Sequence, residues 1–263
     1  MPSQQRIVSL APSVTSILLA LGARHVLAGV SKWCKEVARV GKLPQVGDCW
    51  KLDIAEVIRL RPTLLIGSVP FAAETVARIL EQPIAFLALN PRSLADIEND
   101  IRLLGLVANR RVPAEHLIRD MRRGFRAVAH RVATFQNQPK PSVYCEAWSN
   151  PRISSPPWVA EIAQIAGGKM RVPAGIRITD KEVARAKPDV IVLAWTATGD
   201  RAKAEVALRN PLWKDVPAVK SGRVVVVRDE WLNTPGPPLV QGAWALFRAL
   251  HPEQSPRKKK LRC

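Results

Sequence analysis

The sequence predicts an α/β protein made of two lobes joined by one long helix. Three observations lead to this prediction. Short apolar runs alternate with helical patterns over residues 6–107 and again over 142–250, a single uninterrupted helical pattern separates the two series, and each series contains one helix-Pro-strand unit. Such alternation is typical of mostly parallel sheets with helices on their faces.

The first lobe is predicted over residues 1–111. Pro12-Ser13 can begin a helix and Gly22 can end it, while Pro62 stops a later helix just before an apolar run. Residues 31–52 contain Gly, Pro and two Trp and are expected to be irregular. The expected strands are 6–10, 26–30, 64–67 and 84–89, and the expected helices are 12–21, 53–60, 74–80 and 93–107.

The linking helix is predicted within residues 112–138. Apolar residues recur at helical spacing from Leu117 to Val132, with no proline between Pro113 and Phe135. About 22 residues at 1.5 Å each give a helix roughly 33 Å long, which is long enough to join two lobes.

The second lobe is predicted over 139–252, with strands at 142–147, 190–194 and 223–227 and helices at 159–166, 179–186 and 239–250. Residues 182–192 repeat the pattern of residues 56–66, because each is a short helix, a basic residue, a proline and an apolar strand. Residues 253–263 are expected to be a basic, disordered tail.

The chain of 263 residues carries 40 Lys and Arg against 22 Asp and Glu, a net charge of +18. This balance favours anionic partners and leaves a nucleic-acid-binding protein as one alternative, although the sequence lacks a helix-turn-helix or other reading motif. No apolar run reaches the ~20 residues of a membrane span, and the first residues lack the pattern of a secretory signal. We therefore expect a cytoplasmic monomer, or a periplasmic or cell-surface protein if the true N-terminus is missing.

Catalytic motifs are not found. The sequence lacks phosphate-binding glycine loops, H-E-x-x-H and G-x-S-x-G. Its four His are far apart, Cys145 at a predicted strand end has no His partner, and the four Cys have no zinc-site spacing. We expect that the protein is not an enzyme and that it has no metal site and no intrinsic cofactor. An enzyme that acts on the bound ligand is the alternative hypothesis.

Tryptophan is the strongest site signal. The sequence has eight Trp and one Tyr, and in open α/β sheets ligands bind outside the carboxyl ends of the strands. Five Trp fall at such ends or in the irregular loop, which predicts an aromatic-lined inter-lobe cleft for a bulky ligand: Trp33, Trp50, Trp148, Trp195 and Trp231. Trp158, Trp213 and Trp244 are expected to serve packing.

The chain also resembles a known family. Residues 9–15 (SLAPSVT), 29–31 (GVS), 44–47 (PQVG), 166–168 (AGG), 187–192 (KPDVIV) and 222–224 (GRV) are similar, in order, to the cobalamin-binding and iron-siderophore-binding proteins of ABC importers. The resemblance covers nearly the whole chain and implies two Rossmann-like lobes and a corrinoid (cobalamin-like) ligand. The ligand contacts that it implies are Pro12, Ser13, Trp33, Cys49, Trp50, Phe71, Trp148, Trp195 and Trp231.

The chain also departs from this family. Glu56 next to Ala55, and Asp215, are the nearest counterparts of the acidic residues that dock on a permease, and residues 34–37 read Cys-Lys-Glu-Val in place of Cys-Asp-Tyr-Pro. An ABC importer permease is therefore one expected partner. A cytoplasmic binder of haem, a siderophore or another metal chelate, with a storage or sensing role, is an alternative.

Overall fold

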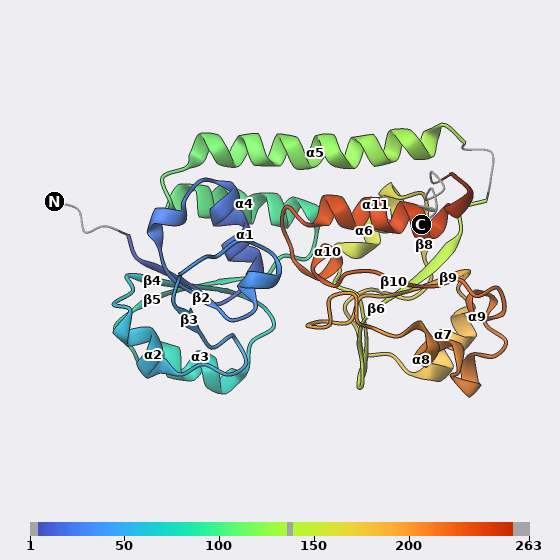
Figure 1. Ribbon diagram of the computed structural model, residues 1–263, viewed down its shortest axis with the longest axis horizontal. Coiled ribbons are helices and arrows are strands. Elements are labelled where there is room, and N and C mark those ends of the chain that lie inside the picture. Colours follow the sequence, from blue (N-terminus) through green and yellow to red (C-terminus); the bar gives the residue numbers. More distant parts are fainter. Residues whose placement is uncertain (1–4, 136–138, 255–263) are drawn as a thin grey trace, which may run out of the picture. The chain divides into compact units, whose positions relative to one another are not determined.

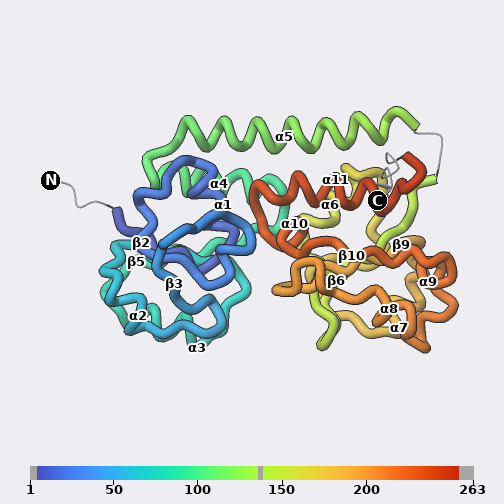
Figure 2. Tube along the Cα trace, in the orientation of Figure 1, coloured from blue at the N-terminus to red at the C-terminus, as the bar shows by residue number. Residues whose placement is uncertain are grey.

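The computed structural model describes residues 5–135 and 139–254 of the chain. These residues divide into two compact units. Unit 1 falls within Met1–Arg122 together with Thr234–Pro238, and unit 2 falls within Arg123–Asn233 together with Leu239–Cys263. Each unit has its own sheet (Figures 1 and 2), so the predicted α/β class is confirmed.

Unit 1 is built on a five-stranded sheet in the order β3-β2-β1-β4-β5, and every neighbouring pair is parallel. Its strands are β1 (Ile7–Ser9), β2 (Leu27–Ser31), β3 (Gln45–Val46), β4 (Leu64–Ser68) and β5 (Ala85–Leu89). The chain extends the sheet to one side of β1 and then to the other, so the carboxyl ends of β1 and β4 form the topological switch point.

Helices cover both faces of this sheet. The α-helices are α1 (Pro12–Ala20), α2 (Ile54–Arg59), α3 (Ala73–Leu80) and α4 (Leu94–Val107), and short 3-10 turns occur at Arg24–Val26 and Cys34–Glu36. Helices α1 and α4 lie on one face, and α2 and α3 on the other (Figure 1). Capping residues fix two helix starts, because the side chains of Asp53 and Ser93 accept backbone N–H bonds from Ala55 and Asp96.

The long helix α5 (Arg111–Ala133) lies where the sequence predicts the linking helix. It begins two residues before Pro113, because proline is tolerated in the first turn, where the N–H groups have no helical partner. Ala114, Ile118, Met121 and Val128 are buried, whereas His116 and His130 are exposed as expected.

Unit 2 contains a sheet in the order β10-β9-β6-β7, and β8 also pairs with β6. Its strands are β6 (Ser142–Ser149), β7 (Arg152–Ser154), β8 (Lys169–Met170), β9 (Val190–Leu193) and β10 (Val224–Val226). Strand β7 is antiparallel to β6, and the other pairs are parallel.

The helices of unit 2 again lie on both faces of its sheet (Figure 1). The α-helices are α6 (Val159–Ile165), α7 (Asp180–Ala186), α8 (Ala204–Leu208), α9 (Pro217–Lys220), α10 (Glu230–Asn233) and α11 (Leu239–Leu250), with 3-10 turns at Pro211–Trp213 and Pro252–Gln254. Helix α11 packs on α6 and α10, and α7 packs on the Pro211–Trp213 turn.

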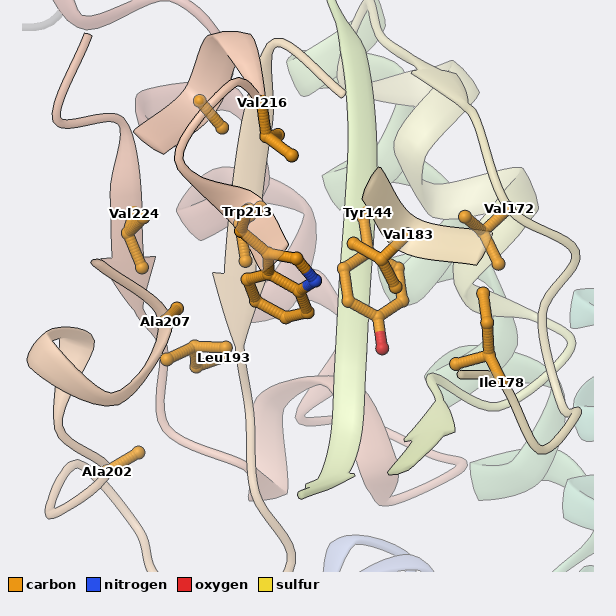
Figure 3. Close-up of a cluster of buried hydrophobic side chains, with 12 residues drawn as sticks. Tyr144, Val172, Ile178, Val183, Leu193, Ala202, Ala207, Trp213, Val216 and Val224 are labelled. Carbon is orange, nitrogen blue, oxygen red and sulfur yellow. The ribbon is translucent and has the colours of Figure 1, made fainter. Parts of the chain in front are cut away.

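A cluster of buried side chains lies between the sheet of unit 2 and its helix α7. Trp213 is fully buried and meets the Tyr144 ring edge to face, with the ring centroids 6.3 Å apart (Figure 3). Leu193 of β9 and Val183 of α7 belong to the same cluster. Burying aromatic rings of this size contributes several kcal/mol to folding.

The repeated helix-Pro-strand pattern corresponds to a repeated backbone feature. Helix α2 is followed by Arg61 at φ 47°, Pro62 and β4, and helix α7 is followed by Lys187 at φ 47°, Pro188 and β9. A left-handed residue ends a helix readily, but a non-glycine side chain makes this conformation costly. Each unit therefore starts a central strand with the same strained junction.

The main helices and strands lie close to their predicted positions. The prediction missed the two-residue strands β3 and β8, the antiparallel strand β7, and the short helices α8, α9 and α10, which are too short for a periodic pattern to show. The predicted lobe boundaries stay predictions, and most of the predicted basic tail lies outside the described residues.

Candidate ligand-binding site

In unit 1, two exposed tryptophans follow neighbouring strands. Trp33 comes two residues after the last residue of β2, and Trp50 comes four residues after the last residue of β3. Strands β2 and β3 are parallel neighbours, so both tryptophans belong to the carboxyl edge of the same sheet. Trp50 is 61% exposed and Trp33 is 37% exposed, which is unusual for the most costly apolar side chain to leave in water.

Asp48 organises both tryptophans. Its Oδ2 accepts the Trp33 indole N–H at 2.6 Å, and its Oδ1 accepts the backbone N–H groups of Trp50 and Lys51, both at 2.9 Å. Lys32 Nζ lies 3.7 Å from Oδ2 and 5.1 Å from the centroid of the Trp33 ring. Burial alone would raise the pKa of Asp48, but these hydrogen bonds and the Lys32 charge outweigh it and hold the pKa below its ordinary value.

The other predicted contacts of unit 1 are less exposed. Ser13 and Cys49 are buried, and Pro12 and Phe71 are partly buried. The Phe71 ring meets Phe86 edge to face at 5.6 Å, and the Cys49 thiol donates to the carbonyl oxygen of Leu10 at 3.5 Å. All four belong to the segments that follow β1, β3 and β4, and their contact with a ligand stays a prediction.

In unit 2, the predicted tryptophans occupy three different elements. Trp148 is near the end of β6 and is 43% exposed, Trp195 follows β9 by two residues, and Trp231 lies in α10. Trp195 and Trp231 are partly buried. The Trp148 indole N–H donates to the backbone oxygen of Asn150 at 2.9 Å. Strands β6 and β9 are parallel neighbours, so Trp148 and Trp195 share the carboxyl edge of this sheet.

Glu146 is fully buried in β6 and receives three donors. Its Oε1 accepts the Trp195 indole N–H at 2.8 Å, and its Oε2 accepts the Tyr144 hydroxyl at 2.7 Å and an N–H of the Arg152 guanidinium. Arg152 also pairs with Asp180 at 2.9 Å, and its guanidinium carbon lies 4.4 Å from the centroid of the Trp213 ring. The pKa of Tyr144 is raised by burial and by the negative charge of Glu146. A buried charge needs such partners, so Trp195 is tied to an ionic network inside unit 2.

The loop after β9 is also held in place. The Asp229 carboxylate accepts the backbone N–H groups of Ala197 at 3.0 Å and Gly199 at 2.6 Å, and burial raises its pKa. Asn233 Nδ2 donates to the backbone oxygen of Ala194 at 2.7 Å. Because Trp195 lies between these anchors, both its backbone and its indole N–H are fixed.

The remaining tryptophans serve packing, largely as predicted. Trp213 is fully buried, and Trp158 is 6% exposed and donates its indole N–H to the backbone oxygen of Leu232. Trp244 is only partly buried and packs edge to face on Phe247 at 5.7 Å.

The cysteines of the described residues are buried thiols. Cys145 does not end a strand, as the sequence suggests, but lies in the middle of β6, where burial raises its pKa to about 12. Burial likewise raises the pKa of Cys49 to about 12 and that of Cys34 above its ordinary value. Thiols of this kind are inert, because the thiolate is the reactive form. Cys263 lies outside the described residues.

The two acidic residues predicted to dock on a permease have different surroundings. Glu56 is partly buried in the first turn of α2. Asp215 is exposed and pairs with Lys220 at 2.9 Å, and this hydrogen bond lowers its pKa. Their docking role stays a prediction. Within residues 5–135 and 139–254, no helix is long and apolar enough to cross a membrane, and no three His, Cys, Asp or Glu side chains gather into a metal site.

Sequence reasoning identified the tryptophans but missed Asp48 and Glu146, the carboxylates that hold them. Asp48 is adjacent to the Cys49-Trp50 pair, and Glu146 is two residues before Trp148. An acidic residue in an apolar strand is a signal that could have identified Glu146, because such a residue is rarely buried without partners. The pairing of Glu146 with Trp195 spans 49 residues and could not be read from spacing.

Comparisons with known proteins agree with this architecture. The family described as "Periplasmic binding protein" matches residues 7–230. An uncharacterized ABC transporter substrate-binding lipoprotein, YvrC of Bacillus subtilis, is 25% identical over 95% of this chain and 81% of its own length. A vitamin B12-binding protein of Pectobacterium carotovorum is 24% identical over 97% of this chain and 92% of its own length.

Among solved structures, a periplasmic heme binding protein from Pseudomonas aeruginosa superposes with a TM-score of 0.83 at 26% identity, covering 98% of this chain and 96% of that one. The relatives include a lipoprotein and periplasmic proteins, so the predicted cytoplasmic location has no support. The family match spans most of the chain and confirms the resemblance to the binding proteins of ABC importers: the chain belongs to the periplasmic binding protein family.

Proposed function

We propose that this chain is the substrate-binding component of an ABC importer and that its ligand is a corrinoid, held by the exposed tryptophans at the carboxyl edges of both sheets. The observation that carries the proposal is the exposure of Trp33, Trp50 and Trp148 at those edges. An indole offers a large flat apolar face with little conformational entropy to lose. A corrin ring is broad and flat enough to cover several such faces.

The chemistry of the edges favours a corrinoid over haem. Haem iron in proteins is held by His, Cys, Met or Tyr. Among the described residues, Tyr144 is buried and bonded to Glu146, Met121 is buried, and the three described cysteines are buried. Met170 is partly buried, but it lies in β8 and pairs with Val143 near the amino end of β6, not at the carboxyl edge.

The histidines do not supply a haem ligand at these edges either. His25 lies before β2, His116 and His130 lie on α5, and His251 is buried against the backbone oxygen of Ala166. Cobalamin brings both of its axial ligands, so it needs only apolar faces and hydrogen bonds from the protein. Vitamin B12-binding proteins among the relatives support the same ligand class.

A haem ligand is the second candidate, because the Pseudomonas aeruginosa protein that superposes at a TM-score of 0.83 is described as a heme binding protein. The two candidates differ in spectroscopy. Coordination of haem iron by a protein side chain changes the Soret and visible bands, whereas stacking alone leaves the coordination state of a corrinoid unchanged.

Calorimetric titration of the purified chain with cyanocobalamin, in parallel with hemin, tests the proposal. We expect one cyanocobalamin per chain, with a Kd in the micromolar range or tighter, about −8 kcal/mol, and no side-chain coordination of hemin. Absence of heat and of tryptophan quenching at about 100 μM cyanocobalamin, well above a micromolar Kd, would contradict the proposal. Coordination of hemin by a side chain of the protein would instead favour haem as the ligand.

A further inference from the structure

The two units share an arrangement that the proposed function does not explain by itself. In each, the N–H of a tryptophan at the carboxyl edge donates to a carboxylate: Trp33 to Asp48 at 2.6 Å in unit 1, and Trp195 to Glu146 at 2.8 Å in unit 2. Asp48 is 9% exposed and Glu146 is fully buried.

Three other tryptophans are bonded differently. The indole N–H groups of the packing residues Trp158 and Trp213 donate to the backbone oxygens of Leu232 and Asp180. The exposed edge residue Trp148 donates to the backbone oxygen of Asn150. Two of these three tryptophans are buried, where a neutral carbonyl is sufficient to satisfy the N–H. Keeping a carboxylate out of water is costly, so its use at both ligand-facing edges calls for an explanation beyond satisfaction of an N–H group.

A carboxylate does more for an indole than a carbonyl does. A charge-assisted hydrogen bond is roughly twice as strong as a neutral one, so it holds the ring plane against rotation about the side-chain bonds. A binding surface that is fixed before the ligand arrives avoids the entropy cost of ordering the ring on binding. Each ring is therefore preset in ligand-free protein.

The supports of each carboxylate are fixed as well. Asp48 is anchored by two backbone N–H groups and Lys32. Glu146 is anchored by Tyr144 and Arg152, and Arg152 in turn pairs with Asp180. A carboxylate held by several other donors has no freedom to follow a moving indole, so the direction of the N–H bond sets the direction of the ring.

We infer that Asp48 and Glu146 are positioning residues, which fix the ring planes of Trp33 and Trp195 for stacking on a flat macrocyclic ligand. This inference rests on the proposed function for the identity of the ligand, but the fixing of the rings is a property of the ligand-free protein. Neither carboxylate needs to touch the ligand.

The Asp48→Asn variant is the sharpest probe. Asn keeps Oδ1 for the N–H groups of Trp50 and Lys51 but turns an NH₂ group toward Trp33, so the indole bond is lost together with the ion pair to the exposed Lys32. Glu146→Gln is the equivalent change in unit 2, where the charge of Arg152 keeps the remaining oxygen and the amide nitrogen faces Trp195. Asp189→Asn is the matched control, because this carboxylate accepts hydrogen bonds from Ser142 at the amino ends of β6 and β9, opposite to the edge that carries Trp195.

The first readout needs no ligand. In protein labelled with ¹⁵N at the tryptophan indoles, we expect Asp48→Asn to move the Trp33 N–H resonance upfield and to broaden it, because a strong hydrogen bond to a carboxylate is lost. Glu146→Gln should do the same to Trp195, and Asp189→Asn should move neither. Indole resonances that stay in place in Asp48→Asn would overturn the inference, even if Glu146→Gln fails to fold.

The second readout is affinity for cyanocobalamin, measured as a double-mutant cycle. Asp48→Asn should weaken binding about tenfold in the wild-type background, the effect expected for a charge-assisted hydrogen bond of ~1.5 kcal/mol. In the Trp33→Phe background, which lacks the indole N–H, it should have no further effect. An equal loss in both backgrounds would overturn the inference, because Asp48 would then act without Trp33. If wild-type protein binds no cyanocobalamin, the proposed function fails and the indole resonances alone decide the inference.

Discussion

Unit 1 and unit 2 hold their edge tryptophans with carboxylates that have very different surroundings. Asp48 lies in a loop, and its partners are the adjacent residues Lys32 and Trp33 and its own near neighbours Trp50 and Lys51. Glu146 lies in the central strand β6, and its network reaches Tyr144, Arg152 and the Trp213 core cluster. A loop carboxylate holds the tryptophan in unit 1, and a core carboxylate holds it in unit 2. Removing the carboxylate should therefore destabilise the two units by different amounts.

The largest expected difference is in stability. Glu146→Ala leaves the Arg152 charge buried without its main partner and should lower the free energy of unfolding by about 3–5 kcal/mol. Asp48→Ala removes loop hydrogen bonds that water can replace and should lower it by about 1–2 kcal/mol. Urea denaturation followed by far-UV circular dichroism measures both losses of unfolding free energy. Equal losses would show that the surroundings of the two carboxylates do not differ in their contribution to stability.

Substitution of an exposed edge tryptophan should weaken ligand binding more than substitution of a buried core tryptophan, although the core substitution should destabilise the fold more. Trp50→Ala removes the most exposed indole of unit 1 and should weaken cyanocobalamin binding about tenfold, or ~1.4 kcal/mol, while changing the free energy of unfolding little. Trp213→Phe is the paired control, since it reduces the buried core of unit 2 and removes no exposed tryptophan of the edge. Calorimetric titration of both variants with cyanocobalamin distinguishes ligand contact from core packing. If Trp213→Phe lost affinity while Trp50→Ala kept it, Trp50 would not be a ligand contact.

The pH dependence of stability should distinguish Asp48 from its amide variant. The folded-state pKa of Asp48 lies below the ordinary value of 3.8, so the ionised side chain stabilises the native state. That contribution is fully present above the unfolded-state pKa and is lost as the pH falls through the folded-state pKa. The difference in unfolding free energy between wild type and Asp48→Asn should therefore be constant near neutral pH and shrink below about pH 4. A difference that grows on acidification would mean that the sign of the shift is wrong.

The smallest effects are expected at the helix-Pro-strand junctions, where the units are most alike. Arg61 and Lys187 both adopt φ 47°, a conformation that glycine adopts without strain. Arg61→Gly and Lys187→Gly should each raise the free energy of unfolding by about 0.5 kcal/mol, the strain relieved less the added chain entropy. Thermal denaturation of the single variants measures this, and destabilisation at either site would mean that its side chain makes a contact that outweighs the strain.

The sequence allowed prediction of the features that depend on local patterns. Apolar runs bounded by Pro and Gly located β1, β4, β6 and β9, and the regular spacing from Leu117 to Val132 located α5. Trp148 is predicted as an edge residue because it follows such a run, and Trp33 and Trp50 are predicted as site residues because they lie in the irregular stretch of residues 31–52.

Features that depend on pairing across the sheet could not be predicted. Strand β3 has only two residues, and it exists because Val30 and Ser31 of β2 offer a parallel partner to Gln45 and Val46. The bond between Glu146 and Trp195 likewise arises from the parallel pairing of β6 with β9, which aligns Glu146 with Leu193. In both cases the partner is chosen by topology, and the sequence near either residue carries no trace of it.

The most direct test of the central claim is a cyanocobalamin titration of wild type and of a Trp50→Ala/Trp148→Ala double variant, one exposed indole removed from each unit, followed by calorimetry. The account predicts one site per chain in the wild type. Because the two indoles belong to separate units, their effects should add to a loss of affinity of about a hundredfold in the double variant. Equal affinity in the two proteins would show that the exposed tryptophans do not form the binding surface and would contradict the account.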